Sequence, residues 1–109
     1  MKVMKQSEMD KITAEGINGL VDVWDGVSED GVVAGIRQVH PNSTVPAQGH
    51  KHPQRQLNFV ISGRCDVYTT NEEERTQLKP GDFLLFDADE PHYFTTYDEP
   101  AVIFEVRYL

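Results

Sequence analysis

Short apolar stretches rich in β-branched and aromatic residues recur along most of the chain, and residues that favour turns separate them. Helical spacing is poor, although residues 7–15 could form one or two helical turns with Ser7 as the N-cap. The pattern predicts strands at 20–25, 31–39, 48–52, 56–62, 64–70, 76–78, 82–87, 92–97 and 101–108. Turn sequences such as Ser62-Gly63 and Pro80-Gly81 lie between them. Many short strands at this spacing indicate an all-β sandwich or barrel.

The predicted strand 56–62 carries different side chains on its two faces, because side chains alternate across a β-strand. If Gln56 points into the protein, then Asn58 and Val60 point the same way. The other face carries Leu57, Phe59 and Ile61. Three large apolar side chains are costly to expose together in water, so we expect this face to pack against a second layer or a second subunit. The pattern therefore favours a homodimer.

Composition and charge narrow the class of protein. A chain of 109 residues fits one domain, and we expect a short N-terminal extension at 1–19 before a β-domain at 20–109. The net charge is -8, which argues against nucleic acids and anionic membranes as partners, because both require a basic surface. A polar N-terminus, no apolar run of membrane-spanning length and the single Cys65 are typical of a cytoplasmic protein. We expect Cys65 to be either a small buried apolar residue or an inert, half-exposed one.

Two histidines one residue apart suggest a metal site. On a strand, His50 and His52 would project from the same face, roughly 6.6 Å apart along its axis, and both could reach one ion. Gln56 would lie roughly 13 Å farther along a continuous strand, so a turn must bring it back. Pro53 favours such a turn, because proline cannot donate to a strand ladder. The best distant candidate for a further ligand is His92, which opens a predicted strand after a turn.

These segments follow a two-part spacing. The first part is His50-x-His52-x3-Gln56-x6-Gly63, and the second comprises Pro80-Gly81-Asp82, Ala88 and Pro91-His92. With these residues the chain resembles the cupins, whose pattern is G-x5-H-x-H-x3–4-E-x6-G followed by G-x5-P-x-G-x2-H. Thr44 stands at the first glycine position, and Asp87 and Asp89 replace the proline and glycine of the second part. The resemblance covers residues 31–107 and implies a jelly-roll β-barrel with one metal ion in its mouth.

Gln56 stands where the cupin pattern has glutamate. Histidines and an amide are neutral ligands, so the full +2 charge of an ion would remain and favour an anionic substrate or an enolate. This donor set favours zinc, with iron, nickel or manganese as alternatives. Alternatively, Gln56 points at the substrate and leaves a site of three histidines. The ligand set is similar to that of a zinc-dependent cupin that cyclises aromatic polyketides.

Other residues are candidates for the pocket itself. We expect Asn58 and Phe94 to line it, and Arg37 to hold a substrate anion or an ordinary ion pair. His40 could be an extra ligand or a solvent-exposed residue, and His40 and Tyr93 are the weak candidates for a general base.

Three functions remain open at this stage. The leading one is a metalloenzyme whose ion acts as a Lewis acid in an isomerase, cyclase or lyase reaction, with an iron-dependent dioxygenase as the alternative. A second is a non-enzymatic module that binds a small sugar or carboxylate. A third is a protein whose function lies in its dimer rather than in its pocket.

Overall fold

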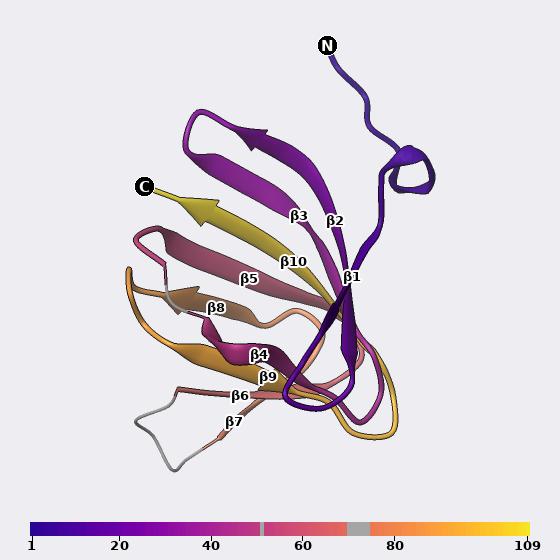
Figure 1. Cartoon of the computed structure of the whole chain (residues 1–109), viewed down its shortest axis with the longest axis vertical. Coiled ribbons are helices and arrows are strands. Elements are labelled where there is room, and N and C mark those ends of the chain that lie inside the picture. Colours follow the sequence, from indigo (N-terminus) through magenta and orange to yellow (C-terminus); the bar gives the residue numbers. More distant parts are fainter. Residues whose placement is uncertain (51, 70–74) are drawn as a thin grey trace.

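The computed structural model describes residues 1–50, 52–69 and 75–109, without the side chain of His50. Two antiparallel sheets pack face to face as a jelly-roll sandwich (Figure 1). The larger sheet has the order β1-β2-β3-β10-β5-β8, and the smaller has the order β4-β9-β6-β7. The strands of the larger sheet are β1 (Ile12–Glu15), β2 (Leu20–Glu29), β3 (Val32–Val39), β10 (Ala101–Tyr108), β5 (Arg55–Ser62) and β8 (Phe83–Phe86). Those of the smaller sheet are β4 (Thr44–His50), β9 (His92–Thr95), β6 (Cys65–Thr69) and β7 (Thr76–Leu78).

The all-β prediction is confirmed, and most strands lie within a residue or two of their predicted bounds. The largest differences are in β2, which continues to Glu29 past an irregularity in its pairing near Gly26, and in β4. The strand predicted at 48–52 instead runs from Thr44 to His50; residue 51 lies outside the described residues, and His52 belongs to no strand. Because proline at 53 restricts the residue before it and cannot donate to a ladder, this is the natural place for the strand to end.

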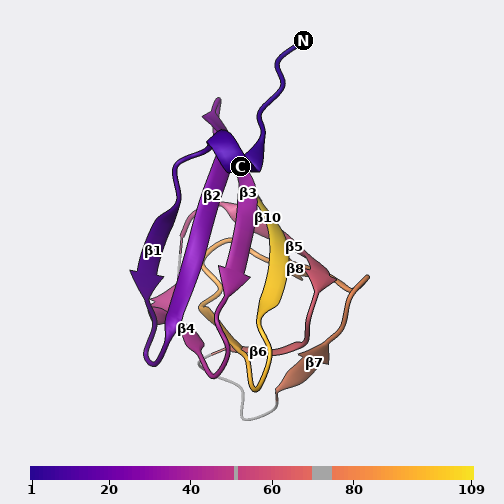
Figure 2. The same cartoon turned by 90° about the vertical axis from the view of Figure 1, so that its right-hand side faces the viewer.

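The helical turns predicted for residues 7–15 are wrong. Only Gln6–Glu8 form a single 3-10 turn, and Ile12–Glu15 form β1, which pairs with β2 at one edge of the larger sheet (Figure 2). The hydroxyl of Thr13 also donates to Asp22 Oδ1 at 2.6 Å. Cross-strand pairing and this bond outweigh a weak local helical preference. No helix in the described part of the chain is long and apolar enough to cross a membrane.

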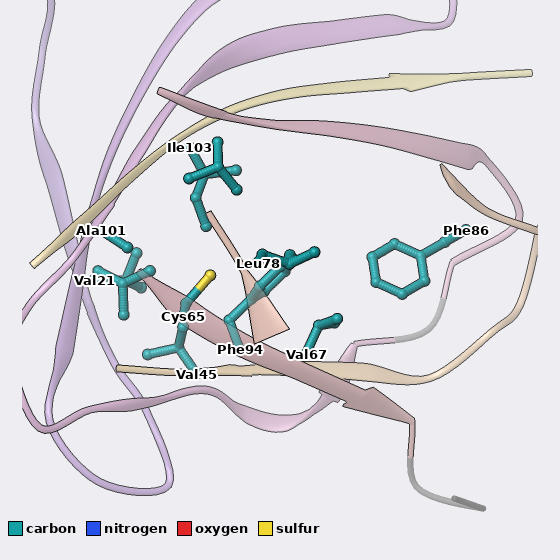
Figure 3. Packing of buried hydrophobic residues seen from close by; sticks show 11 residues of the cluster. Val21, Val45, Cys65, Val67, Leu78, Phe86, Phe94, Ala101 and Ile103 are labelled. Carbon is teal, nitrogen blue, oxygen red and sulfur yellow. The ribbon is translucent and has the colours of Figure 1, made fainter. Parts of the chain in front are cut away.

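The core lies between the inner faces of the two sheets (Figure 3). Its members are Val21, Val39, Val45, Val60, Cys65, Val67, Leu78, Phe86, Phe94, Ala101 and Ile103. Cys65 is fully buried, as expected for a small apolar residue. Gly63, which follows β5, has a φ of 78°, and a Cβ there would lie 2.0 Å from the Pro100 carbonyl oxygen. Only glycine fits this turn, which sends the chain from the larger sheet to the smaller one.

The alternation predicted along 56–62 is confirmed. Gln56, Asn58 and Val60 are buried between the sheets, whereas Ile61 on the opposite face is exposed. The outer face of the larger sheet carries a row of cross-strand neighbours, which we call the outer apolar row: Trp24, Ile36, Phe104, Phe59 and Phe83. A second row beside it comprises Ala34, Val106, Leu57 and Leu85. Phe83 and Leu85 are 67% and 66% exposed, so none of the described residues covers that end of the face.

Candidate metal centre

Strand pairing brings the histidine segments together from distant parts of the sequence. In the pairing of β4 with β9, the backbone of His50 lies directly opposite His92. The backbone N–H of Asp89 donates to the His52 carbonyl at 2.7 Å, which fastens the loop after β4 to the loop before β9. Asp89 has a φ of 62°, in the left-handed region, and it occupies the position where the cupin pattern has glycine. Aspartate tolerates this conformation better than most residues, so the turn keeps its shape without glycine.

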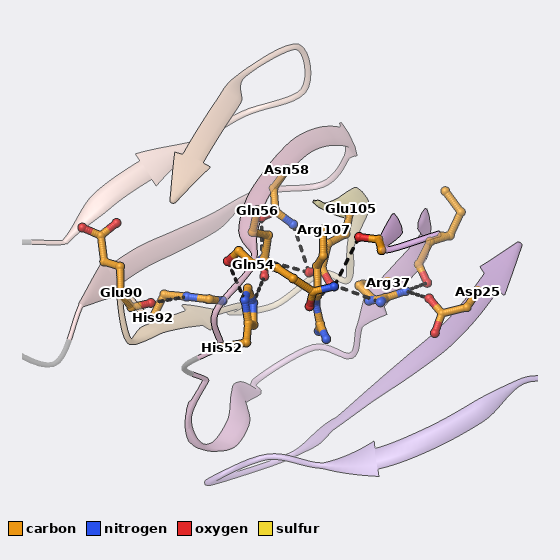
Figure 4. Close-up of polar contacts among 12 residues, drawn as sticks. Asp25, Arg37, His52, Gln54, Gln56, Asn58, Glu90, His92, Glu105 and Arg107 are labelled. Atoms are coloured by element: carbon orange, nitrogen blue, oxygen red, sulfur yellow. Dashed lines mark hydrogen bonds and ion pairs between the residues drawn. The ribbon is translucent and has the colours of Figure 1, made fainter. Parts of the chain in front are cut away.

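Two imidazoles are oriented in the same way by backbone carbonyl groups (Figure 4). Nδ1 of His52 lies 2.8 Å from the Gln54 carbonyl oxygen, and Nδ1 of His92 lies 2.9 Å from that of Glu90. A carbonyl accepts only, so each Nδ1 carries the hydrogen and each Nε2 is the basic nitrogen when the ring is neutral. This arrangement is typical of histidines that bind a metal ion through Nε2.

The ring of His92 is fixed by packing as well. It stacks on Phe86 with centroids 4.0 Å apart and lies 5.9 Å, nearly perpendicular, from the ring of His52. Burial lowers the pKa of His92, although the Glu90 carbonyl and the Glu105 carboxylate act in the opposite direction. His92 is therefore neutral at neutral pH, which is the form that a metal requires.

Gln56 is completely buried, and its amide orientation is determined by its neighbours. The amide nitrogen donates to Asn58 Oδ1 at 2.7 Å and to Glu105 Oε1 at 3.0 Å. The amide oxygen is therefore turned toward His52, with Oε1 2.8 Å from Nε2 (Figure 4). A glutamate at 56 would face the Glu105 carboxylate at this distance, and two such charges repel. Glu105 thus gives a physical reason for an amide at this position.

Glu105 is a buried carboxylate at the centre of a polar network behind Gln56. Its Oε1 accepts from the amides of Gln56 and Asn58, and its Oε2 accepts from Arg37 Nη2 at 3.1 Å and Arg107 Nε at 3.0 Å. Arg37 also pairs with Asp25 at 2.6 Å. Burial alone would raise the pKa of Glu105, but Arg37 and Arg107, with the hydrogen bond from Asn58, hold that pKa below its ordinary value. The carboxylate is therefore ionised, and both of its oxygens accept hydrogen bonds.

The donor chemistry fits a divalent transition-metal ion. His52 and His92 offer Nε2 atoms, Gln56 offers an amide oxygen, and the backbone of His50 lies across from His92. No three His, Cys, Asp or Glu side chains among the described residues form a cluster that could hold an ion. Any ion here would therefore depend on the Gln56 amide or on His50, whose side chain lies outside the described part.

A cavity of about 190 Å³ adjoins this centre. Polar and charged side chains line one part of it, namely Arg37, Asn58, His92, Glu105 and Arg107. The remainder is apolar: Ala14, Val21, Val23, Val39, Val45, Pro46, Phe94 and Ile103. The structure therefore places Asn58, Phe94 and Arg37 on the cavity, with Arg37 held in ion pairs.

The two residues considered as bases lie elsewhere. Nε2 of His40 is 2.9 Å from Asp22 Oδ2, and neither residue lines the cavity. Tyr93 alternates with the inward-facing His92 and Phe94, and its ring stacks on Tyr68 on the outer face of the smaller sheet. The structure does not bring His40 or Tyr93 to the centre.

Sequence reasoning missed Glu105 and Arg107. Both lie on the same face of β10 as the buried Ile103, so they face inward at positions where an apolar residue is expected. Two charged residues on the buried face of a strand were the signal that could have identified them, because such charges are seldom buried without a partner.

Comparison with known proteins agrees with this architecture. The family model described as "Cupin domain" matches residues 35–107. A predicted oxalate decarboxylase from Thermotoga maritima superposes with a TM-score of 0.86 at 18% identity, covering 99% of both chains. The polyketide cyclase RemF from Streptomyces resistomycificus gives 0.83 at 18% identity, covering 99% of this chain and 79% of RemF.

A third structure, HppE in its Fe(II) form, gives a TM-score of 0.81 at 14% identity and covers 99% of this chain and 60% of HppE. No curated protein matches the sequence. At these low identities, the likeness to the three structures shows a shared fold and no more.

Proposed function

The chain belongs to the cupin family, and we propose that it is a small metalloenzyme in which His50, His52, His92 and the amide oxygen of Gln56 hold one divalent ion. The supporting observation is that backbone carbonyls hold Nδ1 of both His52 and His92, while Gln56 turns its oxygen toward the same place. A neutral set of nitrogen and amide ligands favours zinc, followed by iron and nickel, over manganese.

The cavity beside the centre suits a small, largely apolar substrate with a carbonyl or enol oxygen. A bound ion supplies a Lewis acid at that oxygen, which suits isomerisation, cyclisation or elimination. The residues of the chain orient the substrate and exclude water: Phe94, Val39 and Val45 form apolar walls, and Asn58 offers a polar contact. Glu105 keeps the Gln56 oxygen directed at the centre.

A non-catalytic receptor for the same kind of molecule is the competing function. The observation that favours it is that none of the described residues lining the cavity is an evident general base. Arg37 and Glu105 are held in ion pairs, and His92 is a proposed metal ligand. Turnover assays on the metal-loaded protein, with oxygen uptake measured for the iron form, would separate a dioxygenase, an isomerase-type enzyme and a receptor.

The metal content of the purified chain tests the proposal directly. We expect close to one transition-metal ion per chain by elemental analysis, and His52→Ala should abolish it. The matched control is His40→Ala, which removes a histidine that binds Asp22 outside the cavity and should leave the metal content unchanged. Protein that binds no metal after reconstitution with zinc, iron or nickel would contradict the proposal.

We also propose that two copies of the chain associate through the outer apolar row and the row beside it. This face is broad, its far end is exposed at Phe83 and Leu85, and none of the residues in the two rows is acidic. A chain with a net charge of -8 repels a second copy across most surfaces, so contact through an uncharged face costs least. A two-fold dimer would cover the same face on both copies at once.

A further inference from the structure

Arg107 occupies a distinctive position beside the proposed metal centre. In the pairing of β10 with β5 it lies directly opposite Gln56, and it lines the same cavity as His92. Its Nε donates to Glu105 Oε2 at 3.0 Å, which fixes the direction of the guanidinium. Within the described part of the chain, its two terminal nitrogens have no hydrogen-bond partner, and the side chain is 24% exposed.

The second arginine of the cavity is different. Arg37 uses Nη1 for Asp25 and Nη2 for Glu105, and its side chain is only 10% exposed. It is therefore committed to the structure, whereas Arg107 is anchored at one nitrogen and presents two more donors. A guanidinium with two parallel donors matches the geometry of a carboxylate.

The charges around the cavity add to this preference. Arg37 and Arg107 contribute +2 and Asp25 and Glu105 contribute -2, so the protein groups sum to zero. Neutral imidazoles and an amide add nothing, so a divalent ion would bring the loaded site to +2. Such a site stabilises an anion. Of the two described arginines that line the cavity, Arg107 is the one with hydrogen-bond donors that are not used by the protein.

The size and lining of the cavity define the rest of the ligand. A volume of about 190 Å³ exceeds the ~150 Å³ of an apolar cavity that accommodates benzene, so one ring with a substituent fits. Most of the lining is aliphatic or aromatic, which favours an apolar body over a sugar.

We propose that Arg107 binds the carboxylate of a small apolar acid, such as a substituted single-ring or short-chain carboxylic acid, and thereby directs the rest of the molecule toward the metal centre. The orientation toward an ion rests on the proposed function, whereas the contact with Arg107 does not. The carboxylate accepts two hydrogen bonds from the terminal nitrogens, and the apolar body packs against residues such as Phe94 and Val39.

The test compares benzoate with benzamide, which has nearly the same shape but no charge. Calorimetric titration of the full chain, both zinc-loaded and treated with chelator, gives the ratio of the two affinities. We expect Arg107→Met to lower the benzoate-to-benzamide ratio by about tenfold or more in both forms, because a charge-assisted pair of hydrogen bonds is lost. Arg107→Lys should lower this ratio less than Arg107→Met does, because lysine keeps a positive charge beside Glu105. The exposed Arg64→Met is the matched control and should leave the ratio unchanged.

Three outcomes would overturn the inference: a wild-type ratio near one, an unchanged ratio in Arg107→Met, or an equal loss of both ligands. An unchanged ratio in the zinc-loaded form alone would mean that the ion, rather than Arg107, takes the carboxylate. Failure of the proposed function looks different, because the wild-type chain would then bind no metal while the chelator-treated comparison still reports on Arg107.

Discussion

The Nε2 atom of His52 lies 2.8 Å from Oε1 of Gln56. The amide oxygen accepts only, because the amide nitrogen of Gln56 is already directed at Asn58 and Glu105. Nδ1 of the same imidazole also faces an acceptor, the Gln54 carbonyl. A neutral imidazole has one N–H and cannot donate to both. A divalent ion at the contact with Gln56, as proposed above, would bind the lone pairs of both Nε2 and the amide oxygen.

The hydrogen bond from the Gln56 amide nitrogen to Glu105 predicts that positions 56 and 105 are energetically coupled. Gln56→Glu alone should destabilise the fold by about 1–3 kcal/mol, because it sets a carboxylate against that of Glu105. Adding Glu105→Gln restores an amide–carboxylate pair with the roles exchanged, so the double variant should be more stable than the sum of the single effects. Urea denaturation of the four proteins measures this coupling, and strictly additive effects would contradict it.

Burial of Cys65 predicts that its thiol is unreactive in the native protein. Burial, with a smaller contribution from the charge of Asp66, raises the pKa of Cys65 to about 12. At pH 8 only about one thiol in ten thousand is then ionised, and the thiolate is the reactive form. Mass spectrometry should show no alkylation by iodoacetamide in native protein and complete alkylation in guanidinium chloride. Native labelling at the rate of a free cysteine would contradict this.

A third prediction concerns the attachment of β1 through Asp22. Burial would raise the pKa of Asp22, but the hydrogen bonds from Thr13 and His40 and the charge of His40 outweigh it, so the pKa lies below its ordinary value of 3.8. A carboxyl whose pKa is lower in the folded state stabilises the fold above the unfolded pKa and loses that contribution as pH falls through the folded pKa.

Asp22→Asn should therefore cost about 1 kcal/mol at pH 7 and progressively less below pH 4. Urea midpoints of both proteins at pH 7 and pH 3 give the comparison. Asp98→Asn is a suitable control, since Asp98 is exposed and lies in the connection between β9 and β10. A cost for Asp22→Asn that is equal at the two pH values would assign it to packing instead.

The sequence was sufficient for most of the strands and for the inward side of β5, because both follow from local alternation. It could not place His52, since alternation assumes a continuous strand and β4 ends at His50. Nor could it identify β1, whose formation depends on pairing with β2 rather than on its own residues. The network around Glu105 depends on the register of β10 between β3 and β5, and that register follows from the fold as a whole.

In the candidate site, too, some features follow from the sequence and others only from the fold. The spacing of His50, His52, Gln56 and His92 identified the segments, but not the orientation of any side chain. The carbonyls of Gln54 and Glu90, which fix the two imidazoles, carry no signal in their residue types. His40 was a candidate because it is close to His50 in the sequence, but in the fold it contacts Asp22 and does not line the cavity.

The exposed end of the outer apolar row leads to the last prediction. Leu85 is 66% exposed and lies opposite Leu57, and Phe83 packs on Phe59 with ring centroids 4.7 Å apart. If two copies meet here, the wild-type chain should sediment at twice 12.4 kDa, and Leu85→Glu should give a monomer, because each interface would then bury a carboxylate without a partner. Ile17→Glu is the matched control: Ile17 is 58% exposed but lies in the connection between β1 and β2, outside the two rows. Sedimentation equilibrium decides the matter, and a wild-type mass of one chain, or a Leu85→Glu variant that remains dimeric, would contradict association through this face.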